Sequence, residues 1–176
     1  AMIEPPLAGR RYLLFADACV GKQAAGSDDT KRDTHAYGII KDAYINPETR
    51  EREPVQVVCS CMGDDPTNPQ DKSGDRSPTT EFIRRVVALS VFYGDCKVVP
   101  EINNKDDIAD RLIAAGVKNM FVLGSVGKDG SKPGSTHTSE VFGWLTDEGS
   151  RRQLVDCIEE MTRQQQWNCT FNWILH

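Results

Sequence analysis

The pattern of hydrophobic and polar positions predicts short strands first and helices later in the chain. Three brief apolar runs come first: RRYLLFADA (10–18), THAYGIIKDAYI (34–45) and VQVVCSCM (55–62). Short apolar runs bounded by Gly, Pro and charged residues are typical of buried strands. The segment NPETREREP (46–54) is predicted to be a turn between the second and third strands. We therefore expect the three strands to form an antiparallel meander.

The second half of the chain alternates between helical and strand patterns. The segment TTEFIRRVVALSVFYG (79–94) carries apolar residues at helical spacing behind a Thr placed to cap the helix: Phe82, Val86, Leu89 and Tyr93. The next predicted elements are a strand in DCKVVPE (95–101), a helix in KDDIADRLIAAG (105–116) that Gly116 closes, and a strand in NMFVLG (119–124). A strand, a helix and a strand in succession imply a parallel crossover.

Loops and a final helix complete the predicted fold. Three segments rich in Gly, Ser, Pro and charge are expected to be loops: 18–34, 63–78 and 125–140. The segment 147–166 is predicted to be an amphipathic helix with Leu154, Ile158 and Met161 on one face. The predicted class is α/β: a mixed sheet, with an antiparallel meander of three strands followed by two parallel strand-helix units, and helices packed on it.

Composition indicates an ordinary folded protein. The chain has 176 residues, of which 39% are hydrophobic and 27% charged, so we expect one domain over residues 1–176. A net charge of −5 and a pI near 5.2 argue against a protein that coats nucleic acid by charge alone. They do not exclude a nuclease, because metal-binding carboxylates contribute negative charge.

The cysteines, the lack of long apolar runs and the chain ends indicate where the protein resides and whether the chain is part of a longer one. Six cysteines without a C-x-x-C pair, and no secretory signal, indicate reduced thiols in an intracellular protein. Cys59 and Cys61 are interpreted as small buried hydrophobes, because no His or Cys stands at zinc spacing from them. No apolar run approaches the roughly 20 residues that span a membrane, so a soluble protein is expected. The opening AM and the apolar ending WNCTFNWILH suggest an excised fragment of a longer chain.

Two carboxylates at strand ends are the strongest candidates for chemistry. Asp17 ends the first predicted strand and Glu101 the fourth. If the fourth strand pairs alongside the first, these acids come out side by side at one edge of the sheet. Adjacent carboxylates repel each other, and a divalent cation coordinated by oxygen compensates for that repulsion. The alternative is that Asp17 caps the following loop and Glu101 caps the helix near Lys105, and the residues alone do not decide between the two.

Three motifs resemble a known family. FADACVG…RDTHAYGII is similar to the first nuclease motif of phage and herpesvirus terminase large subunits, an apolar strand ending in Asp and a loop that ends in a second Asp. FYGDCKVVPEINN resembles their second motif, a strand ending in Glu followed by one residue and Asn-Asn. TSEVFGWLTDEGSRRQLVDCIEEM is similar to their Gly-Trp-x-Thr turn and Arg-bearing helix. The resemblance runs from about Tyr12 to Arg163.

The resemblance implies an RNase H-like fold and a viral DNA-packaging enzyme. The activity implied is that of a metal-dependent endonuclease, a two-metal-ion phosphodiester hydrolase that uses Mg²⁺ or Mn²⁺ to cut concatemeric viral double-stranded DNA. Asp17 matches the family's first metal-binding Asp, Glu101 its second acid, and Asp33 an auxiliary catalytic Asp. Asn103 and Asn104, the Asn-Asn of the second motif, are candidates to hold the ligands or a phosphate in place.

The resemblance also implies partners and a location. The partners are double-stranded DNA, the ATPase motor domain, the small terminase subunit and the capsid portal. The location is the infected host cell, in the cytoplasm for a phage or the nucleus for a herpesvirus. Loop residues that are candidates for contacting DNA phosphates are Lys72, Arg76, Lys128 and Lys132. Ordinary solvated loops are the alternative explanation for these four.

Other conspicuous side chains are interpreted as structural. His35 and His137 are expected to be surface or hydrogen-bonding residues rather than ligands. The tryptophans are candidates for stacking on bases, but their sequence context favours packing: Trp144, Trp167 and Trp173.

The chain departs from the family pattern in two places. Lys105 and two aspartates follow the Asn-Asn pair, where the family usually has a Gly-containing segment. The family's third metal-binding Asp lies beyond the stretch that FNWILH begins, and Asp156 does not match it, so weak activity is expected. Two alternatives remain: a catalytically incomplete RNase H-like module that binds DNA or the portal, and another RNase H-like nuclease such as a resolvase or transposase. The virus of origin, cleavage specificity, oligomeric state and preferred metal stay open.

Overall fold

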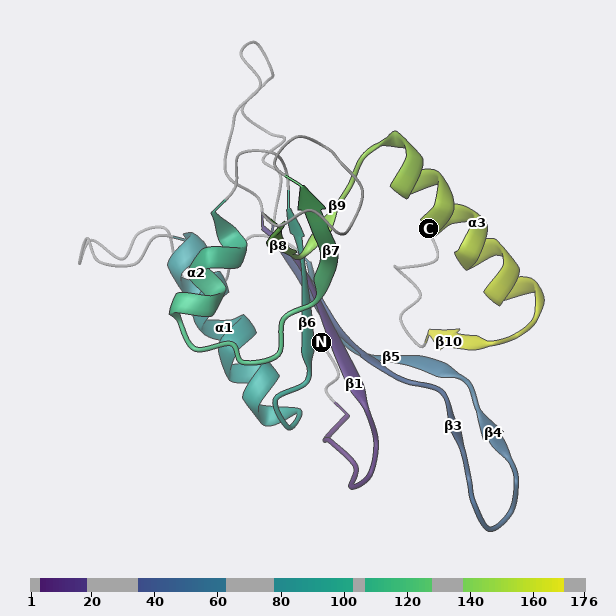
Figure 1. The fold of residues 1–176 in the computed structure, drawn as a ribbon. Coiled ribbons are helices and arrows are strands. Elements are labelled where there is room, and N and C mark those ends of the chain that lie inside the picture. Colours follow the sequence, from purple (N-terminus) through teal and green to yellow (C-terminus); the bar gives the residue numbers. More distant parts are fainter. Residues whose placement is uncertain (1–3, 19–34, 63–77, 103–106, 128–137, 170–176) are drawn as a thin grey trace.

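The computed structural model describes residues 4–18, 35–62, 78–102, 107–127 and 138–169, which form a mixed sheet with helices on it (Figure 1). The six strands lie in the order β10-β5-β2-β1-β6-β9. Their bounds are Tyr12–Asp17 (β1), Ala36–Lys41 (β2), Val55–Met62 (β5), Lys97–Ile102 (β6), Trp144–Leu145 (β9) and Trp167–Cys169 (β10). The helices of the described part are Pro78–Phe92 (α1), Ile108–Ala114 (α2) and Glu148–Arg163 (α3). The predicted α/β class with a mixed sheet is confirmed.

The first three sheet strands form the predicted antiparallel meander. β1 pairs with β2 and β2 with β5, both antiparallel, so that Asp17, Ala36 and Met62 lie in one row. The predicted single strand 34–45 is wrong in its extent, because β2 ends at Lys41. Tyr44–Ile45 (β3) instead pairs with Arg52–Glu53 (β4) in a separate two-stranded ribbon.

The Asn46 side chain stabilises the turn that joins β3 and β4 within the predicted turn segment. The Asn46 carboxamide oxygen accepts hydrogen bonds from the backbone N–H groups of Glu48 at 2.9 Å and Thr49 at 3.2 Å. Asn side chains that bond to backbone groups two or three residues on are typical of tight turns. The turn is therefore fixed locally, and the flanking residues pair with each other.

The parallel half of the sheet is built through α1 and α2. β6 pairs with β1 in parallel, and β9 pairs with β6 in parallel. The predicted strand 95–101 and the helices 79–94 and 105–116 are confirmed within a few residues at their ends. α1 begins at Pro78, so Thr79 lies in the first turn instead of capping it. Proline suits this position, because its missing N–H would have no helical partner there.

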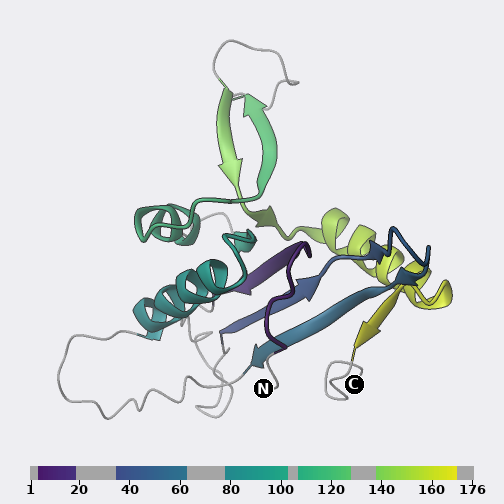
Figure 2. The same ribbon diagram turned by 90° about the horizontal axis from the view of Figure 1, so that it is seen from below.

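The last predicted strand, 119–124, does not continue in the sheet. Only Met120 forms a parallel bridge, with Val98, before the chain turns away. Val122–Gly127 (β7) pairs antiparallel with Thr138–Phe142 (β8), and Figure 2 shows this hairpin projecting from the body. The flanks of the predicted loop 125–140 are therefore strands. β9 takes the place beside β6 when the chain returns.

A glycine makes the return possible. Gly143 has a φ of +99°, a conformation that residues with a side chain rarely adopt. A Cβ on Gly143 would lie 2.8 Å from the Pro100 carbonyl oxygen and 2.8 Å from Ile102 Cγ2. The Gly143 N–H donates to the Phe121 carbonyl at 2.8 Å, which closes the base of the hairpin. The chain re-enters the sheet in close contact with β6.

The core lies between one face of the sheet and the helices α1 and α2. Sheet and helix side chains that are almost fully buried meet there: Leu14, Ala16, Val98, Phe82, Val86 and Leu112. Cys59 and Cys96 are also buried, and burial raises the pKa of both thiols, that of Cys96 to about 11. These thiols behave as small hydrophobes, as the interpretation of Cys59 expected. None of the described helices is both long and apolar enough to cross a membrane.

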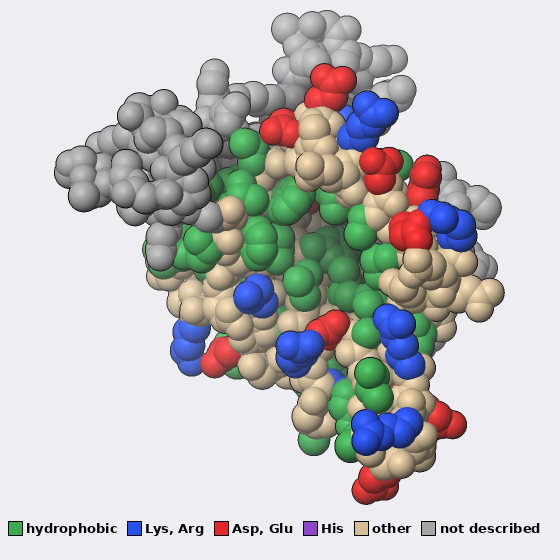
Figure 3. Space-filling view, turned by 45° about the vertical axis from the view of Figure 1, so that its right-hand side comes forward, with side chains coloured by type: hydrophobic (Ala, Val, Ile, Leu, Met, Phe, Trp, Pro, Cys, Tyr) green, Lys and Arg blue, Asp and Glu red, His purple; other side chains and the backbone are tan. Residues whose placement is uncertain are grey.

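α3 differs from the other helices because its apolar face is exposed. The predicted helix 147–166 forms, and the Asp147 carboxylate caps it by accepting from the Ser150 N–H at 2.7 Å. Leu154 is 42% exposed and Ile158 is 50% exposed, and α3 has no buried residue. The expected packing on the sheet is thus found for α1 and α2 and not for α3. Figure 3 shows a hollow lined by hydrophobic side chains on the side of the molecule that it presents.

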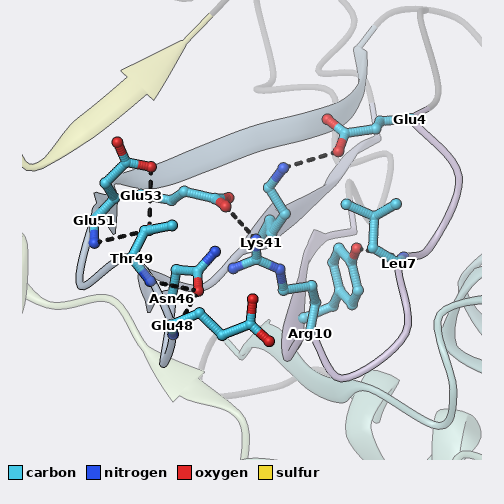
Figure 4. Close-up of polar contacts among 10 residues, drawn as sticks. Glu4, Leu7, Arg10, Lys41, Asn46, Glu48, Thr49, Glu51 and Glu53 are labelled. Atoms are coloured by element: carbon cyan, nitrogen blue, oxygen red, sulfur yellow. Dashed lines mark hydrogen bonds and ion pairs between the residues drawn. The ribbon is translucent and has the colours of Figure 1, made fainter.

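Ion pairs hold the N-terminal segment to the sheet (Figure 4). The Lys41 ammonium, in a side chain that is 7% exposed, lies 2.8 Å from the Glu4 carboxylate. Arg10 pairs with Glu53, and its guanidinium lies 3.5 Å from the centre of the Tyr44 ring. These contacts fix the chain that leads into β1.

Candidate metal centre at the ends of β1 and β6

Asp17 and Glu101 occupy neighbouring positions on adjacent parallel strands. The register of β1 and β6 pairs Ala16 with Pro100, and each acid is the next residue on its strand. Neighbouring strands lie about 4.8 Å apart, so the two backbones bring these carboxylates within reach of one ion. The condition set in the sequence analysis, that the fourth predicted strand pairs alongside the first, is met.

Both acids belong to the face of the sheet that α1 and α2 leave open. Ala16 and Pro100 are buried, and successive side chains of a strand point to opposite faces. Asp17 and Glu101 therefore project to the other face, the side on which α3 lies (Figures 1 and 2). Asp17 is exposed and Glu101 is half-buried. A ligand from solvent can reach both side chains.

The helix-capping explanation for Glu101 does not hold. α2 begins at Ile108, and its N-cap is Asp107. Glu101 lies inside β6, one residue before the strand ends. Its side chain is therefore not needed to begin the following helix. The loop that Asp17 was considered to cap lies outside the described residues.

A tryptophan stands on the other side of Glu101. The parallel register of β6 and β9 pairs Glu101 with Trp144, so that Asp17, Glu101 and Trp144 form a row across three strands. The Trp144 indole nitrogen is buried, and no hydrogen-bond partner for it is found in the described part of the chain. The Trp144 ring lies 6.3 Å from that of Phe121, between centroids. The sequence interpretation of Trp144 as a packing residue gave no sign of this position, which depends on the two-residue pairing of β9.

An ionic cluster around the buried Glu81 lies at the same end of the sheet, on the helix side. Glu81 in the first turn of α1 is 2% exposed, and it accepts hydrogen bonds from Arg84 Nε at 2.7 Å and from Arg85 Nε at 3.0 Å. The bond from Arg84 is the main cause that lowers the Glu81 pKa to about 2. The next residue, Phe82, stacks on His35 with ring centroids 4.7 Å apart. Because His35 directly precedes β2, the start of α1 lies near the end of the sheet that carries Asp17.

The remaining predicted site residues lie outside the described residues. They are Asp33, Asn103, Asn104, Lys72, Arg76, Lys128 and Lys132. In the part of the chain that the structure describes, no group of three or more His, Cys, Asp or Glu side chains is arranged to hold a metal ion. The candidate site of that part is therefore the pair of carboxylates.

Comparison of the chain with protein-family models gives no match, and comparison with curated proteins gives no significant match. Inference about function therefore rests on the fold, the carboxylate pair and the motifs.

Proposed function

We propose that this chain is a metal-dependent endonuclease domain of the terminase large subunit type, which cuts concatemeric viral double-stranded DNA during packaging. One observation carries the proposal: Asp17 and Glu101 are neighbours at the ends of two parallel strands in the middle of the sheet. Two neighbouring carboxylates repel each other, and a divalent cation coordinated by oxygens of both would compensate for that repulsion.

The chemistry of the two donors fits a divalent cation. Carboxylate oxygens are the ligands that Mg²⁺ takes from proteins, usually one or two per ion, with waters completing the shell. Both side chains are accessible, and both are mounted on strands that the core fixes in place. Mg²⁺ or Mn²⁺ is therefore the cofactor we propose, with Asp17 and Glu101 as its ligands.

The roles that we propose for Asp17, Glu101 and the cation follow from where the two acids lie on their strands. Asp17 and Glu101 would hold and orient the cation, and the rigid strands would keep the separation of the two acids constant. Such a cation would lower the pKa of a bound water and stabilise the oxygen that leaves the phosphodiester. Backbone phosphates, and not bases, are then the groups that such a site engages.

The arrangement of the sheet supports an RNase H-like fold as part of this proposal. Three antiparallel strands are followed along the chain by strands parallel to the first, as the resemblance implies. The Gly143-Trp144 turn leads through Thr146 into α3, which carries Arg151 and Arg152. We further propose the partners that the family implies: the ATPase motor domain, the small terminase subunit and the capsid portal, in the infected host cell.

A plasmid assay tests the activity. Supercoiled plasmid is incubated with the chain and either Mn²⁺, Mg²⁺ or EDTA, and the open-circular and linear forms are quantified. We expect nicking with Mn²⁺, none with EDTA, and at least a hundredfold loss in Asp17→Asn. Asp156→Asn, an exposed acid of α3, is the matched control and should cut like the wild type.

The form of the products separates the alternatives. Cleavage of a long random duplex into a continuous smear agrees with a packaging nuclease. Discrete fragments would favour a resolvase-like enzyme instead. Binding of duplex DNA without any metal-dependent cleavage would overturn the nuclease proposal and leave a binding module.

A further inference from the structure

The indole N–H of Trp144 is a buried donor, and its nitrogen has essentially no contact with solvent. Among the residues that the structure describes, it has no hydrogen-bond acceptor. Leaving a buried polar group unpaired destabilises the folded state, so native proteins have few such groups and each calls for an explanation. Trp167 shows the ordinary situation, since its Nε1 donates to Thr162 Oγ1 at 2.8 Å. Trp144 therefore has a capacity for hydrogen bonding that the structure as it stands does not use.

An acceptor is present on the neighbouring strand. Glu101 and Trp144 are paired in the parallel register of β6 and β9, so their side chains project from the same face. A carboxylate offers about four acceptor sites, more than one cation occupies. Glu101 also has a flexible side chain, so that binding of an ion can turn its second oxygen toward the indole.

The backbone around this pair is held closely. Gly143, which precedes Trp144, packs against both neighbours of Glu101, because a Cβ on it would meet Pro100 and Ile102 at 2.8 Å. The Phe121 carbonyl accepts from the Gly143 N–H, and the Phe121 ring lies beside Trp144. The backbones of Trp144 and Glu101 are thus held beside each other as paired residues of neighbouring strands.

We propose that Trp144 is a positioning residue for the metal centre: its indole N–H donates to the Glu101 carboxylate when a divalent cation is bound. This inference rests on the proposed function, because it requires Glu101 to be a ligand. The hydrogen bond fixes the orientation of the liganding carboxylate, as partners behind metal ligands commonly do. It also supplies the acceptor that the buried N–H lacks.

Mg²⁺ binding by matched tryptophan variants is the first test. Trp144→Phe keeps an aromatic ring at the site and removes the N–H, whereas Trp167→Phe makes the same change at a tryptophan that already has a partner. Isothermal titration calorimetry should show about 10-fold to 100-fold weaker Mg²⁺ binding for Trp144→Phe, the usual effect of removing a partner behind a ligand. Trp167→Phe should bind Mg²⁺ within twofold of the wild type. Circular dichroism checks that both variants are folded.

A direct readout of the N–H comes from nuclear magnetic resonance of the wild-type chain labelled with ¹⁵N-tryptophan. The Trp144 indole signal is assigned by comparison with Trp167→Phe and Trp173→Phe, which each remove one of the other signals. On titration with Mg²⁺, which is diamagnetic, the Trp144 indole proton should move downfield and saturate with the calorimetric affinity. The Trp167 signal should stay in place.

The outcomes distinguish this inference from the proposed function. If the wild type binds Mg²⁺ while the Trp144 signal does not move, the positioning role is wrong and the metal centre stands. Equal Mg²⁺ affinities for the two Phe variants would likewise contradict the positioning role alone. If the wild type binds neither Mg²⁺ nor Mn²⁺, the metal centre fails, and the role of Trp144 fails with it.

Discussion

Asp17 and Glu101 stand one residue beyond the paired residues Ala16 and Pro100, at the same level of two neighbouring parallel strands. Both follow a buried residue and turn to the face that the core does not use. At neutral pH two neighbouring carboxylates repel, and an effective dielectric constant well above that of a dry interior keeps the cost modest at an accessible site. The fold therefore tolerates the pair of acids, and a bound cation would offset the repulsion between the two carboxylates.

Neutralising either acid should abolish metal binding without unfolding the protein. For Asp17→Asn and Glu101→Gln we expect no measurable Mn²⁺ binding by calorimetry. For Glu101→Gln the free energy of unfolding in urea should stay the same or rise by up to about 1 kcal/mol, because a like-charge repulsion is removed, and Asp17→Asn should remain folded. Asp156→Asn should change neither quantity. Loss of folding in either variant would show instead that the acid has a structural role, and the metal centre would be wrong.

Gly143 joins the hairpin to β9, which pairs with the Glu101 strand of the proposed metal centre, so replacing it should damage both the hairpin and metal binding. Gly143→Ala forces a residue with a side chain to a φ of +99° and brings its Cβ to 2.8 Å from the Pro100 carbonyl oxygen. We expect a loss of about 2 kcal/mol or more in the free energy of unfolding. Because Pro100 and Ile102 flank Glu101, Mn²⁺ affinity should fall in the same variant, measured where it is still folded.

Gly149→Ala is the matched control for this change. Gly149 lies in α3, where an added Cβ would meet only Asp147 Oδ1, at 3.4 Å. Alanine is favoured over glycine in helices by up to about 1 kcal/mol, so this variant should be as stable as the wild type or slightly more stable. Equal effects of the two substitutions would mean that the contact of Gly143 with β6 does not matter for stability.

The parts of the fold that could be predicted are those that local pattern determines. The strand ending at Asp17 and the helix containing Phe82 and Val86 follow from the spacing of their apolar residues, which directly reflects the buried face. The order of strands and helices predicted a mixed sheet, but Glu101 lies beside Asp17 only because the fourth strand pairs with the first, which the order left as a condition. The hairpin of β7 and β8 could not be predicted, because it depends on where the chain leaves and re-enters the sheet, between Phe121 and Gly143.

In the candidate site, too, features set by local sequence pattern could be predicted and features set by long-range contacts could not. The carboxylates could be found from the sequence because each ends a recognisable strand. Trp144 could not be placed beside Glu101, since β9 is only two residues long and its pairing with β6 is a long-range contact. The exposed face of α3 was also not predictable, because its pattern of Leu154 and Ile158 is the same as that of a buried helix.

Glu81 should contribute to stability in a pH-dependent way. The arginines hold its folded pKa at about 2, below the ordinary value of 4.5. Its contribution is thus fully present above about pH 4.5 and is lost as the pH falls toward 2. Glu81→Gln should be less stable than the wild type by about 1–3 kcal/mol at pH 7, since Arg85 would lose a charged partner. Urea unfolding at several pH values should show this difference shrinking below pH 4.5, and a difference independent of pH would contradict the assignment.

Breaking the ion pair of Lys41 should show how strongly the N-terminal segment is held. The Lys41 side chain is 7% exposed and Glu4 32%, so Glu4→Gln leaves a buried ammonium beside a neutral partner. We expect a loss of about 1–3 kcal/mol in the free energy of unfolding, because the cost of a buried charge then lacks compensation. Lys41→Met removes the charge together with the pair and should cost less.

Lys118 and Asp95 form a matched exposed pair, with side chains 74% and 44% exposed. Asp95→Asn should therefore change stability by no more than about 0.5 kcal/mol. If Glu4→Gln is as mild as Asp95→Asn, the N-terminal segment is not held by this pair, and hydrogen exchange at residues 4–11 should then be as fast with Glu4 as without it.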